Sequence, residues 1–391
     1  MRIAISGAGV AGAALAHWLH RTGHTPTLIE QAQQFRTGGY MIDFWGVGYQ
    51  VATRMGIEGP IRAAGYEMEL LRSVGARGEV KADVDVNAFR RLLGTDFTSL
   101  PRGDLAAAIY ATIEDKVETV FGDSIAAVDE DDDGVRLTLE GGGTREFDLV
   151  IGADGLHSNV RRLVFGPEEQ FERYLGCKVA ACVVDGYRPR DELAYVTYAV
   201  PGRQLARFAL RGDRTTFLFI FRAEHGGAGM SPKAQLRNTF GDCGWEANDM
   251  LAALDDAKDL YFDVVSQIQM DRWSRGRVLL VGDAAGCISL LGGEGTGLAI
   301  TEAYVLAGEL ARAGGDHRRA FDDYEARLRP FIESKQAGAA RFIGFFATRT
   351  RFGLWLRNVA MRTMNFGPMT RLLAGDVRDD FELPDYDGSY R

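Results

Sequence analysis

The sequence predicts an α/β protein in which a Rossmann-like domain is joined to a second domain with a mostly antiparallel β-sheet and to a long C-terminal helix. Residues 1–30 read as an apolar strand, a glycine-rich turn, a helix and a second strand. From Lys178 to Arg222, strand-like segments follow one another without helices. No acidic residue lies between Glu333 and Asp376, where arginines are interleaved with aromatic residues. These three patterns are typical of a parallel βαβ unit, an antiparallel sheet and a helix that packs across domains.

The glycine turn of the first unit predicts a dinucleotide site. Gly7 permits a tight turn, Gly9 lets the backbone approach a pyrophosphate, and Gly12 allows the helix to pack closely on the strand. The helix N-terminus offers free N–H groups and the positive end of its dipole to phosphates. Glu30, eighteen residues after Gly12, is placed to accept the ribose hydroxyls and to repel a 2′-phosphate. The unit therefore predicts FAD or NAD rather than NADP.

Length and composition limit the class of protein. The 391 residues fit two or three domains. A hydrophobic content of 46% and a charged content of 25% are ordinary for a globular protein. No apolar run is long enough to span a bilayer, and the chain starts on a core strand without a signal-peptide pattern, so we expect a cytoplasmic protein. The net charge of −9 argues against a nucleic-acid partner.

The cysteines and histidines predict neither a metal site nor disulfides. The four cysteines are widely spaced, form no CxxC pair and lie near no histidine pattern. We expect them to be small, buried thiols. They are Cys177, Cys182, Cys243 and Cys287.

Two further loops resemble the first in their position after buried apolar strands. One is Gly152-Ala153-Asp154-Gly155, after Asp148 to Ile151, and the other begins at Gly282-Asp283 and continues through the glycines from Gly292 to Gly297. The carboxyl ends of parallel strands meet at one sheet edge, where ligands bind. The pair Gly38-Gly39 also predicts backbone close to a ligand.

Together, the three loops point to FAD as the ligand. Together they can contact a ligand longer than a mononucleotide. Asp283 is a hydroxyl acceptor suited to a ribityl chain, and the glycine turn before the last helix offers N–H donors to a flavin ring. Only FAD has a ribityl chain and an isoalloxazine ring for this third site.

With these motifs the sequence resembles the class A flavoprotein monooxygenases, which have the para-hydroxybenzoate hydroxylase fold. Its layout is similar to that of tetracycline-inactivating enzymes and of hydroxylases acting on polyketide-like aromatics. The resemblance implies an α/β FAD-binding domain, Rossmann-like and of the glutathione-reductase type, in residues 1–68, 103–172 and 266–318. It implies a substrate domain in 69–102 and 173–265, bridged by a helical segment in 319–391.

The resemblance also implies the reaction. NADPH or NADH binds transiently and reduces the flavin, and molecular oxygen then forms a C4a-hydroperoxide that hydroxylates an aromatic or enolic small molecule. Because the flavin carries this chemistry, we assign no catalytic side chain. We expect a monomer or a homodimer.

By motif match, Arg102 contacts the ribityl and phosphate region, Asp154 and Gly155 line the groove shared by flavin and nicotinamide, and Arg161 fixes that loop. The predicted cofactor-binding residues are Gly7, Gly9, Gly12, Glu30, Gly39, Arg102, Asp154, Gly155, Asp283, Gly292 and Gly295.

The sequence departs from the family at the flavin loops. A usual proline is missing from 286–292, Glu294 replaces a frequent glutamine, and Trp45 stands where an arginine is often found. We expect these changes to affect flavin movement and reduction more than binding. Trp45 either stacks near the ring or simply packs.

The substrate is expected between the flavin and the antiparallel sheet. Arg207, Phe219 and Trp45 are candidate contacts, with Phe217 and Phe221 completing an aromatic wall. The alternatives are a surface arginine and an ordinary sheet core.

Other functions stay open at this point. One is an FAD-dependent alkene reductase of the geranylgeranyl-reductase type, and another is a non-catalytic flavoprotein that binds planar drugs. A flavin halogenase is disfavoured because the sequence has no Trp-x-Trp-x-Ile-Pro stretch. The basic, aromatic C-terminal stretch either packs across the domains or lies on a membrane surface.

Overall fold

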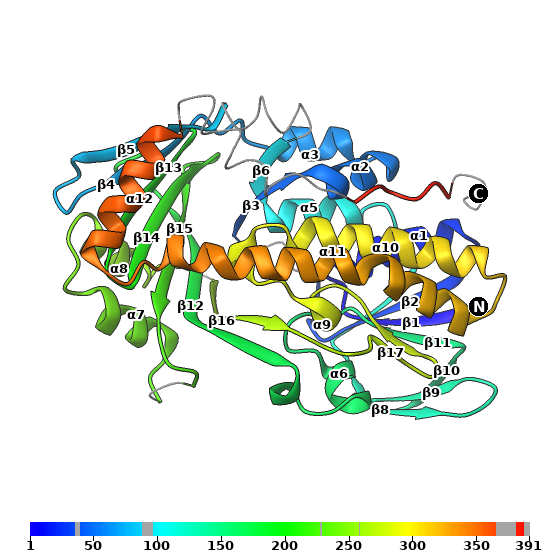
Figure 1. The fold of residues 1–391 in the computed structure, drawn as a ribbon. Helices are drawn as coiled ribbons and strands as arrows, with labels where there is room; N and C mark the ends of the chain where they lie inside the picture. Colours follow the sequence, from blue (N-terminus) through cyan, green and yellow to red (C-terminus); the bar gives the residue numbers. More distant parts are fainter. Residues whose placement is uncertain (36–39, 88–96, 227–228, 258, 365–380, 387–391) are drawn as a thin grey trace.

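Two β-sheets, joined by one long helix, form the framework of the protein (Figure 1). The computed structural model describes residues 1–35, 40–87, 97–226, 229–257, 259–364 and 381–386, apart from the side chains of residues 341 and 342. The sequence predictions for Gly38 and Gly39 lie outside the described residues.

The first sheet is parallel except at one edge, as the βαβ pattern predicts. Its order is β17-β18-β11-β1-β2-β7. β1 lies between β2 and β11, so that Ile5 pairs with Leu28 on one side and with Ile151 on the other. The strands are β1 (Arg2–Ser6), β2 (Thr25–Glu30), β7 (Glu118–Phe121), β11 (Leu149–Gly152), β17 (Ser274–Arg275) and β18 (Val278–Leu280).

Helices cover one face of this sheet, and a small sheet lies on its other side (Figure 1). Helix α1 (Val10–Arg21) packs against α10 (Gly295–Arg312). The small residues of α1 are buried and let the two helices approach each other. The small antiparallel sheet contains β8 (Ile125–Glu130), β9 (Val135–Leu139) and β10 (Thr144–Phe147).

The second sheet is mostly antiparallel, as predicted. Its order is β16-β12-β15-β14-β13-β4-β5, and only the pairing of β13 with β4 is parallel. Its strands are β4 (Leu70–Val74), β5 (Val80–Asp85), β12 (Glu172–Asp185), β13 (Ala194–Val200), β14 (Arg203–Leu210), β15 (Arg214–Arg222) and β16 (Leu260–Ile268). β3 (Met41–Trp45) and β6 (Phe97–Pro101) form a separate antiparallel pair.

Successive side chains of β15 point to opposite faces of the second sheet, and their contacts show what each face packs against. Phe217, Phe219 and Phe221 pack with α7 (Pro232–Phe240) and α8 (Ala247–Ala253). Ile220 points the other way and packs with Leu291 near the first sheet. The face that meets the nucleotide-binding unit is therefore not the phenylalanine face.

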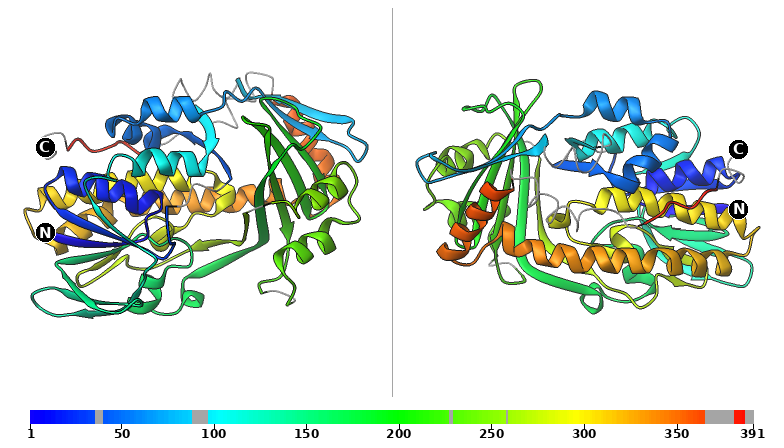
Figure 2. Two further views of the ribbon diagram at one scale, coloured as in Figure 1. Left: turned by 180° about the vertical axis from the view of Figure 1, so that it is seen from behind. Right: turned by 45° about the horizontal axis from the view of Figure 1, so that its top comes forward.

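Two helices lie in residues 317–364 of the C-terminal region. α11 (His317–Phe346) runs from the first sheet to the second (Figure 2). α12 (Arg351–Thr363) is a separate helix, and the Thr350 side chain caps it by accepting a hydrogen bond from the Gly353 N–H at 3.0 Å. The long helix is thus present, and a second helix follows it.

One face of α12 packs on the sheet and the other meets solvent. Met361 lies in a buried cluster with residues of β5. Phe352, Trp355 and Leu356 on the opposite side are 70%, 59% and 53% exposed. The membrane-surface alternative for this helix stays open. In the described part of the chain, no helix is long and apolar enough to cross a membrane.

Shorter helices of the described residues lie between the strands. They are α2 (Gly46–Arg54), α3 (Glu58–Ala64), α5 (Arg102–Tyr110), α6 (Asn159–Val164) and α9 (Asp283–Gly286), with short 3₁₀ turns at Glu168–Gln170 and Leu290–Gly292. The four cysteines are free and buried, as expected. The division into domains at the predicted boundaries stays a prediction; β6, which falls in the predicted segment 69–102, pairs with β3 of the first segment.

Candidate functional site

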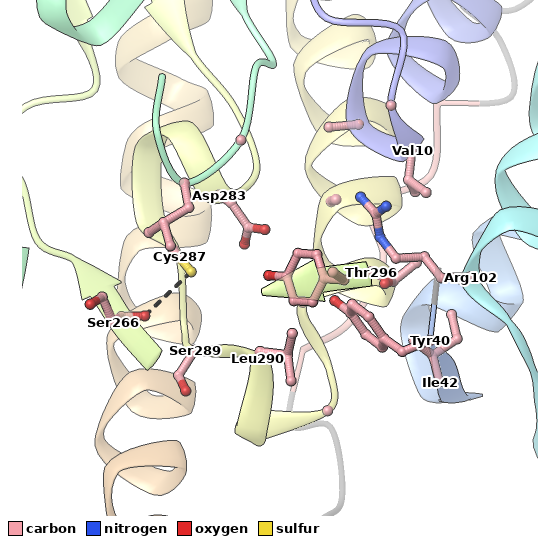
Figure 3. A pocket seen from close by; sticks show the side chains of 18 of the residues that line it. Val10, Tyr40, Ile42, Arg102, Ser266, Asp283, Cys287, Ser289, Leu290 and Thr296 are labelled. Atoms are coloured by element: carbon pink, nitrogen blue, oxygen red, sulfur yellow. Dashed lines mark hydrogen bonds between the residues drawn. The ribbon is translucent and has the colours of Figure 1, made fainter. Parts of the chain in front are cut away.

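The three predicted loops border one cavity at the carboxyl ends of the parallel strands (Figure 3). The cavity and its open mouth together enclose about 860 Å³ of space. Five residues predicted from the sequence line it: Gly9, Arg102, Gly155, Asp283 and Gly295.

The start of α1 offers an open anion site to this cavity. Gly7 has a φ of +98°, and a Cβ atom on Gly12 would overlap with the carbonyl oxygen of Gly7. A Cβ atom on Gly9 would meet no protein atom within 4 Å. No side chain caps α1, so its first N–H groups stay available. The turn therefore fits a pyrophosphate that takes the place a side chain would fill.

Glu30 holds the glycine turn from behind. Its two carboxylate oxygens accept hydrogen bonds from the Ala8 N–H at 2.9 Å and the Ala32 N–H at 2.8 Å. Glu30 is not among the residues that line the cavity. In this structure it supports the turn, and a ribose contact stays a prediction.

The carboxylate of Asp154 makes its hydrogen bonds within the second loop and the helix that follows it. Its carboxylate accepts hydrogen bonds from the Ser158 hydroxyl at 2.5 Å and the Val160 N–H at 3.0 Å. Burial raises the pKa of Asp154, and these hydrogen bonds oppose the rise. The neighbouring Gly155 faces the cavity with a φ of +81° and open space beside it. The carboxylate therefore shapes the loop, while the glycine leaves room for a ligand.

Arg161 joins the second loop to the third. Its side chain is fully buried, and it donates hydrogen bonds to the carbonyl oxygens of Leu156 and Ala284 at 2.6 and 3.0 Å. It also pairs with Glu168 at 2.7 Å. This is the loop-fixing role that the family resemblance implies.

Asp283 and Arg102 extend into the cavity from opposite sides (Figure 3). Burial raises the pKa of Asp283, and the positive charge of Arg102 opposes this rise. A carboxylate that accepts hydrogen bonds and a guanidinium that donates them can hold a polyhydroxylated, phosphorylated chain. This pair of groups fits the ribityl and phosphate part of FAD.

The start of α10 provides a second set of free N–H groups. Gly293 and Gly295 line the cavity, and no side chain caps the helix. Gly292 lies behind them, where a Cβ atom would be 3.0 Å from the Ala339 Cβ. The N-cap residue Glu294 pairs with Lys335 of α11 at 2.6 Å.

Two tyrosines that the sequence reasoning missed close the cavity. Tyr40, just before β3, and Tyr261 of β16 both line it, and their ring centroids are 5.4 Å apart. The Tyr261 hydroxyl donates to the Asp263 carboxylate at 3.2 Å. The adjacency of Tyr40 to Gly39 was the available sequence signal. The substrate was expected beside the second sheet, to which Tyr261 belongs, but its side chain was not singled out.

His157 links the same region to the second sheet. Its Nε2 is 3.0 Å from Asp263 of β16, and its Nδ1 is 2.8 Å from Glu168. The hydrogen bond to Asp263 raises the pKa of His157 to about 9, with Glu168 adding to the rise and burial opposing it. His157 therefore joins the two sheets as a charged group at neutral pH.

Trp45 lies beside the flavin loop predicted from the sequence. A Cβ atom on Gly293 would be 4.0 Å from Cη2 of Trp45. The Trp45 ring also packs against Phe97, with centroids 6.0 Å apart, and borders a second, smaller cavity that Glu294 lines. Both alternatives for Trp45, packing and stacking near a ring, remain compatible with this position.

Arg207 and Phe219 lie elsewhere than expected. Arg207 is buried and pairs with Glu246 and Asp191, each at 2.7 Å. Phe219 packs against Phe240 of α7. Both side chains are on the sheet face turned away from the cavity, so the expected contacts need correction. The alternation of the strands was right, but the sequence does not tell which face meets the cofactor.

In the described residues, no group of three or more His, Cys, Asp or Glu side chains could hold a metal ion.

Comparisons with known proteins agree with this geometry. The family described as "FAD binding domain" matches residues 1–337. An uncharacterized protein of Mycobacterium tuberculosis (strain H37Rv) is 40% identical over 353 residues, covering 85% of this chain and 91% of the relative. A flavin-dependent monooxygenase from an unknown prokaryotic organism is 36% identical over 344 residues, covering 86% of this chain and 88% of the relative. The crystal structure of tetracycline destructase Tet(51) has a TM-score of 0.84 at 30% identity, covering 98% of this chain and 99% of that one.

Proposed function

We propose a function from the premise that this chain belongs to the FAD binding domain family as a class A flavin-dependent monooxygenase. The protein is an FAD-dependent aromatic hydroxylase. In our proposal, NADPH or NADH supplies the electrons, molecular oxygen is the second substrate, and the organic substrate is a phenolic, polyketide or tetracycline-like molecule. The observation that carries this proposal is that three glycine loops, each after a parallel strand, meet at one cavity with tyrosines at its wall.

The proposed FAD site follows the cavity from end to end. Gly7, Gly9, Gly12 and Glu30 would form its adenosine and pyrophosphate end. Arg102 and Asp283 would hold the ribityl chain, while Asp154 and Gly155 would shape the groove beside it. Gly292 and Gly295 would back the flavin ring. The open space at Gly9 and the uncapped starts of α1 and α10 support this direction of binding.

Bound flavin supplies electron transfer and the activation of oxygen. The protein itself positions the cofactor and the substrate and shields the site from water. The N–H groups at the start of α10 can hold a ring carbonyl oxygen, and the carboxylate of Asp283 can accept ribityl hydroxyls. Tyr40 and Tyr261 cover the cavity with their rings and limit the access of water.

The substrate would lie next to Trp45, between the flavin loop and the sheet face that meets it. The name of the tetracycline destructase to which the structure is similar supports a planar, polyhydroxylated substrate. We further propose a monomer or homodimer in the cytoplasm, where nicotinamide cofactors are available.

A screen for substrate-stimulated NADPH and NADH oxidation tests the proposal. Phenols, tetracyclines and other polyketides are added to the FAD-loaded protein, and products are analysed by mass spectrometry. We expect one class to stimulate oxygen consumption and to gain the mass of one oxygen atom. A product with two added hydrogens would instead indicate an alkene reductase. Tight ligand binding with unstimulated, slow NADPH oxidation would indicate a binding protein.

A further inference from the structure

Glu302 is a buried carboxyl group directly behind the third loop. It lies on α10 and is 2% exposed. Its Oε2 accepts a hydrogen bond from the Gly282 N–H at 2.6 Å and another from the Tyr324 hydroxyl of α11 at 2.9 Å. Among the described residues, no Lys, Arg or His forms an ion pair with it. A buried carboxylate without a cation is costly, so this position needs an explanation.

The contact with Gly282 controls the turn that presents Asp283. Gly282 has a φ of +63°, and a Cβ atom there would be 3.1 Å from the Ala11 Cβ and 3.6 Å from the Ala299 Cβ. The turn is thus confined by α1 and α10, and α9 begins at the next residue, Asp283. Its one backbone N–H is fixed by Glu302. The direction of the Asp283 carboxyl into the cavity therefore depends on this hydrogen bond.

The surroundings of Glu302 favour its neutral form. Burial raises the pKa of Glu302 to about 7, the negative charge of Asp283 adds to the rise, and the hydrogen bonds from Gly282 and Tyr324 oppose it. The titratable groups that act on it are Asp283 of α9 and Tyr324 of α11. The diphosphate of FAD brings two further negative charges to the same sheet edge. Coulomb repulsion between these charges would favour a protonated Glu302 in the complex.

We propose that Glu302 is a positioning residue of the FAD site: its neutral carboxyl group holds the Gly282 turn, and FAD binding takes up one proton from solvent at this group. The inference rests on the FAD site of the proposed function. It adds a residue that lies outside the cavity lining and acts on the cofactor through Gly282 and Asp283. FAD affinity then falls as pH rises, because the ionised carboxylate must be protonated before the complex forms.

Titration of the apoprotein with FAD between pH 6 and pH 9 tests this inference, with flavin fluorescence as the readout. For the wild type we expect the Kd to rise above about pH 7, approaching tenfold per pH unit. Glu302→Gln keeps the acceptor for Gly282 but cannot ionise, so its Kd should not change over this range. Glu302→Ala leaves the Gly282 N–H without a partner, and its Kd should exceed that of Glu302→Gln on the order of tenfold.

Tyr324→Phe is the matched control. It removes one hydrogen bond to Glu302 but keeps the carboxyl group, so the pH dependence should persist and begin at a higher pH. A Glu302→Gln variant whose Kd still rises with pH as in the wild type would overturn the inference, as would a Glu302→Ala variant with wild-type affinity. Thermal melting of the apoproteins checks folding, and the Gln variant decides the question if the Ala variant does not fold. A wild type that binds no FAD at any pH would instead contradict the proposed function.

Discussion

Arg161 donates a hydrogen bond from Nη1 to the carbonyl oxygen of Ala284 at 3.0 Å, and this bond joins α6, which follows the second loop, to α9, which lies within the third. Neither residue is near the other in sequence. Because the two loops carry Gly155 and Asp283, the shape of the cofactor cavity depends on a side chain that does not line it.

Replacing Arg161 by Met should destabilise the protein strongly. The change removes a buried guanidinium and leaves the carbonyl oxygens of Leu156 and Ala284 without this donor, while Glu168 keeps its contact with His157. A buried hydrogen-bonding group left without its partner costs about 1–3 kcal/mol, and two carbonyl oxygens lose theirs here. Urea unfolding of Arg161→Met measures the loss, with Arg162→Met at the exposed neighbouring position as control. Equal midpoints for the two variants would contradict the role of Arg161.

Two glycine substitutions separate folding from cofactor binding. Gly12→Ala places a methyl group against the Gly7 carbonyl, so we expect a poorly folded protein. Gly9→Ala places the methyl group in open space, so the protein should fold as the wild type. It should bind FAD at least about fivefold more weakly, because one blocked phosphate contact costs about 1 kcal/mol or more. Circular dichroism and FAD titration measure the two effects. Wild-type FAD affinity in Gly9→Ala would argue against a pyrophosphate at this turn.

His157 should stabilise the protein in a pH-dependent way. Its pKa is raised from 6.5 to about 9 in the folded protein. The stabilisation is therefore complete below about pH 6.5 and is lost as pH rises through 9. The difference in melting temperature between wild type and His157→Gln should follow this course between pH 6 and pH 10. His20→Gln, at an exposed position of α1, is the control. A difference that does not change with pH would refute the link to Asp263 and Glu168.

Arg207 should affect stability rather than substrate binding. In Arg207→Met, the mostly buried carboxylate of Glu246 loses its cationic partner and keeps only the hydrogen bond from the Tyr187 hydroxyl, at a cost of about 3 kcal/mol. Once a substrate is known, its KM should stay at the wild-type value in the folded fraction of the variant. A raised KM without loss of stability would contradict this prediction and would indicate that Arg207 contacts the substrate.

The parts of the site that the sequence predicts are those set by local geometry. Gly7 needs a positive φ and Gly12 needs the absence of a Cβ atom, and both requirements fix the residue type. Asp283 follows a buried strand, so its place at the sheet edge could be predicted from the order of the elements.

The parts that it does not predict depend on how distant segments pack. Phe219 and Ile220 are neighbours on one strand but face opposite sides of the sheet, and the pattern alone does not tell which side meets the cofactor. Tyr40 precedes β3 and Tyr261 lies on β16, so their contact depends on how the β3–β6 pair and the second sheet are placed. Glu302 stands in a helix that is otherwise apolar around it, and its role depends on Gly282, twenty residues earlier in the chain.

A crystal structure of the protein with FAD would test the central claim most directly, namely that one FAD molecule spans the three loops. The predicted result has the pyrophosphate at the N–H groups of Val10 and Ala11, the ribityl hydroxyls within hydrogen-bond distance of Asp283, and the flavin ring against Gly293 and Gly295. An FAD molecule that leaves Asp283 without a contact, or a flavin ring away from the start of α10, would contradict it.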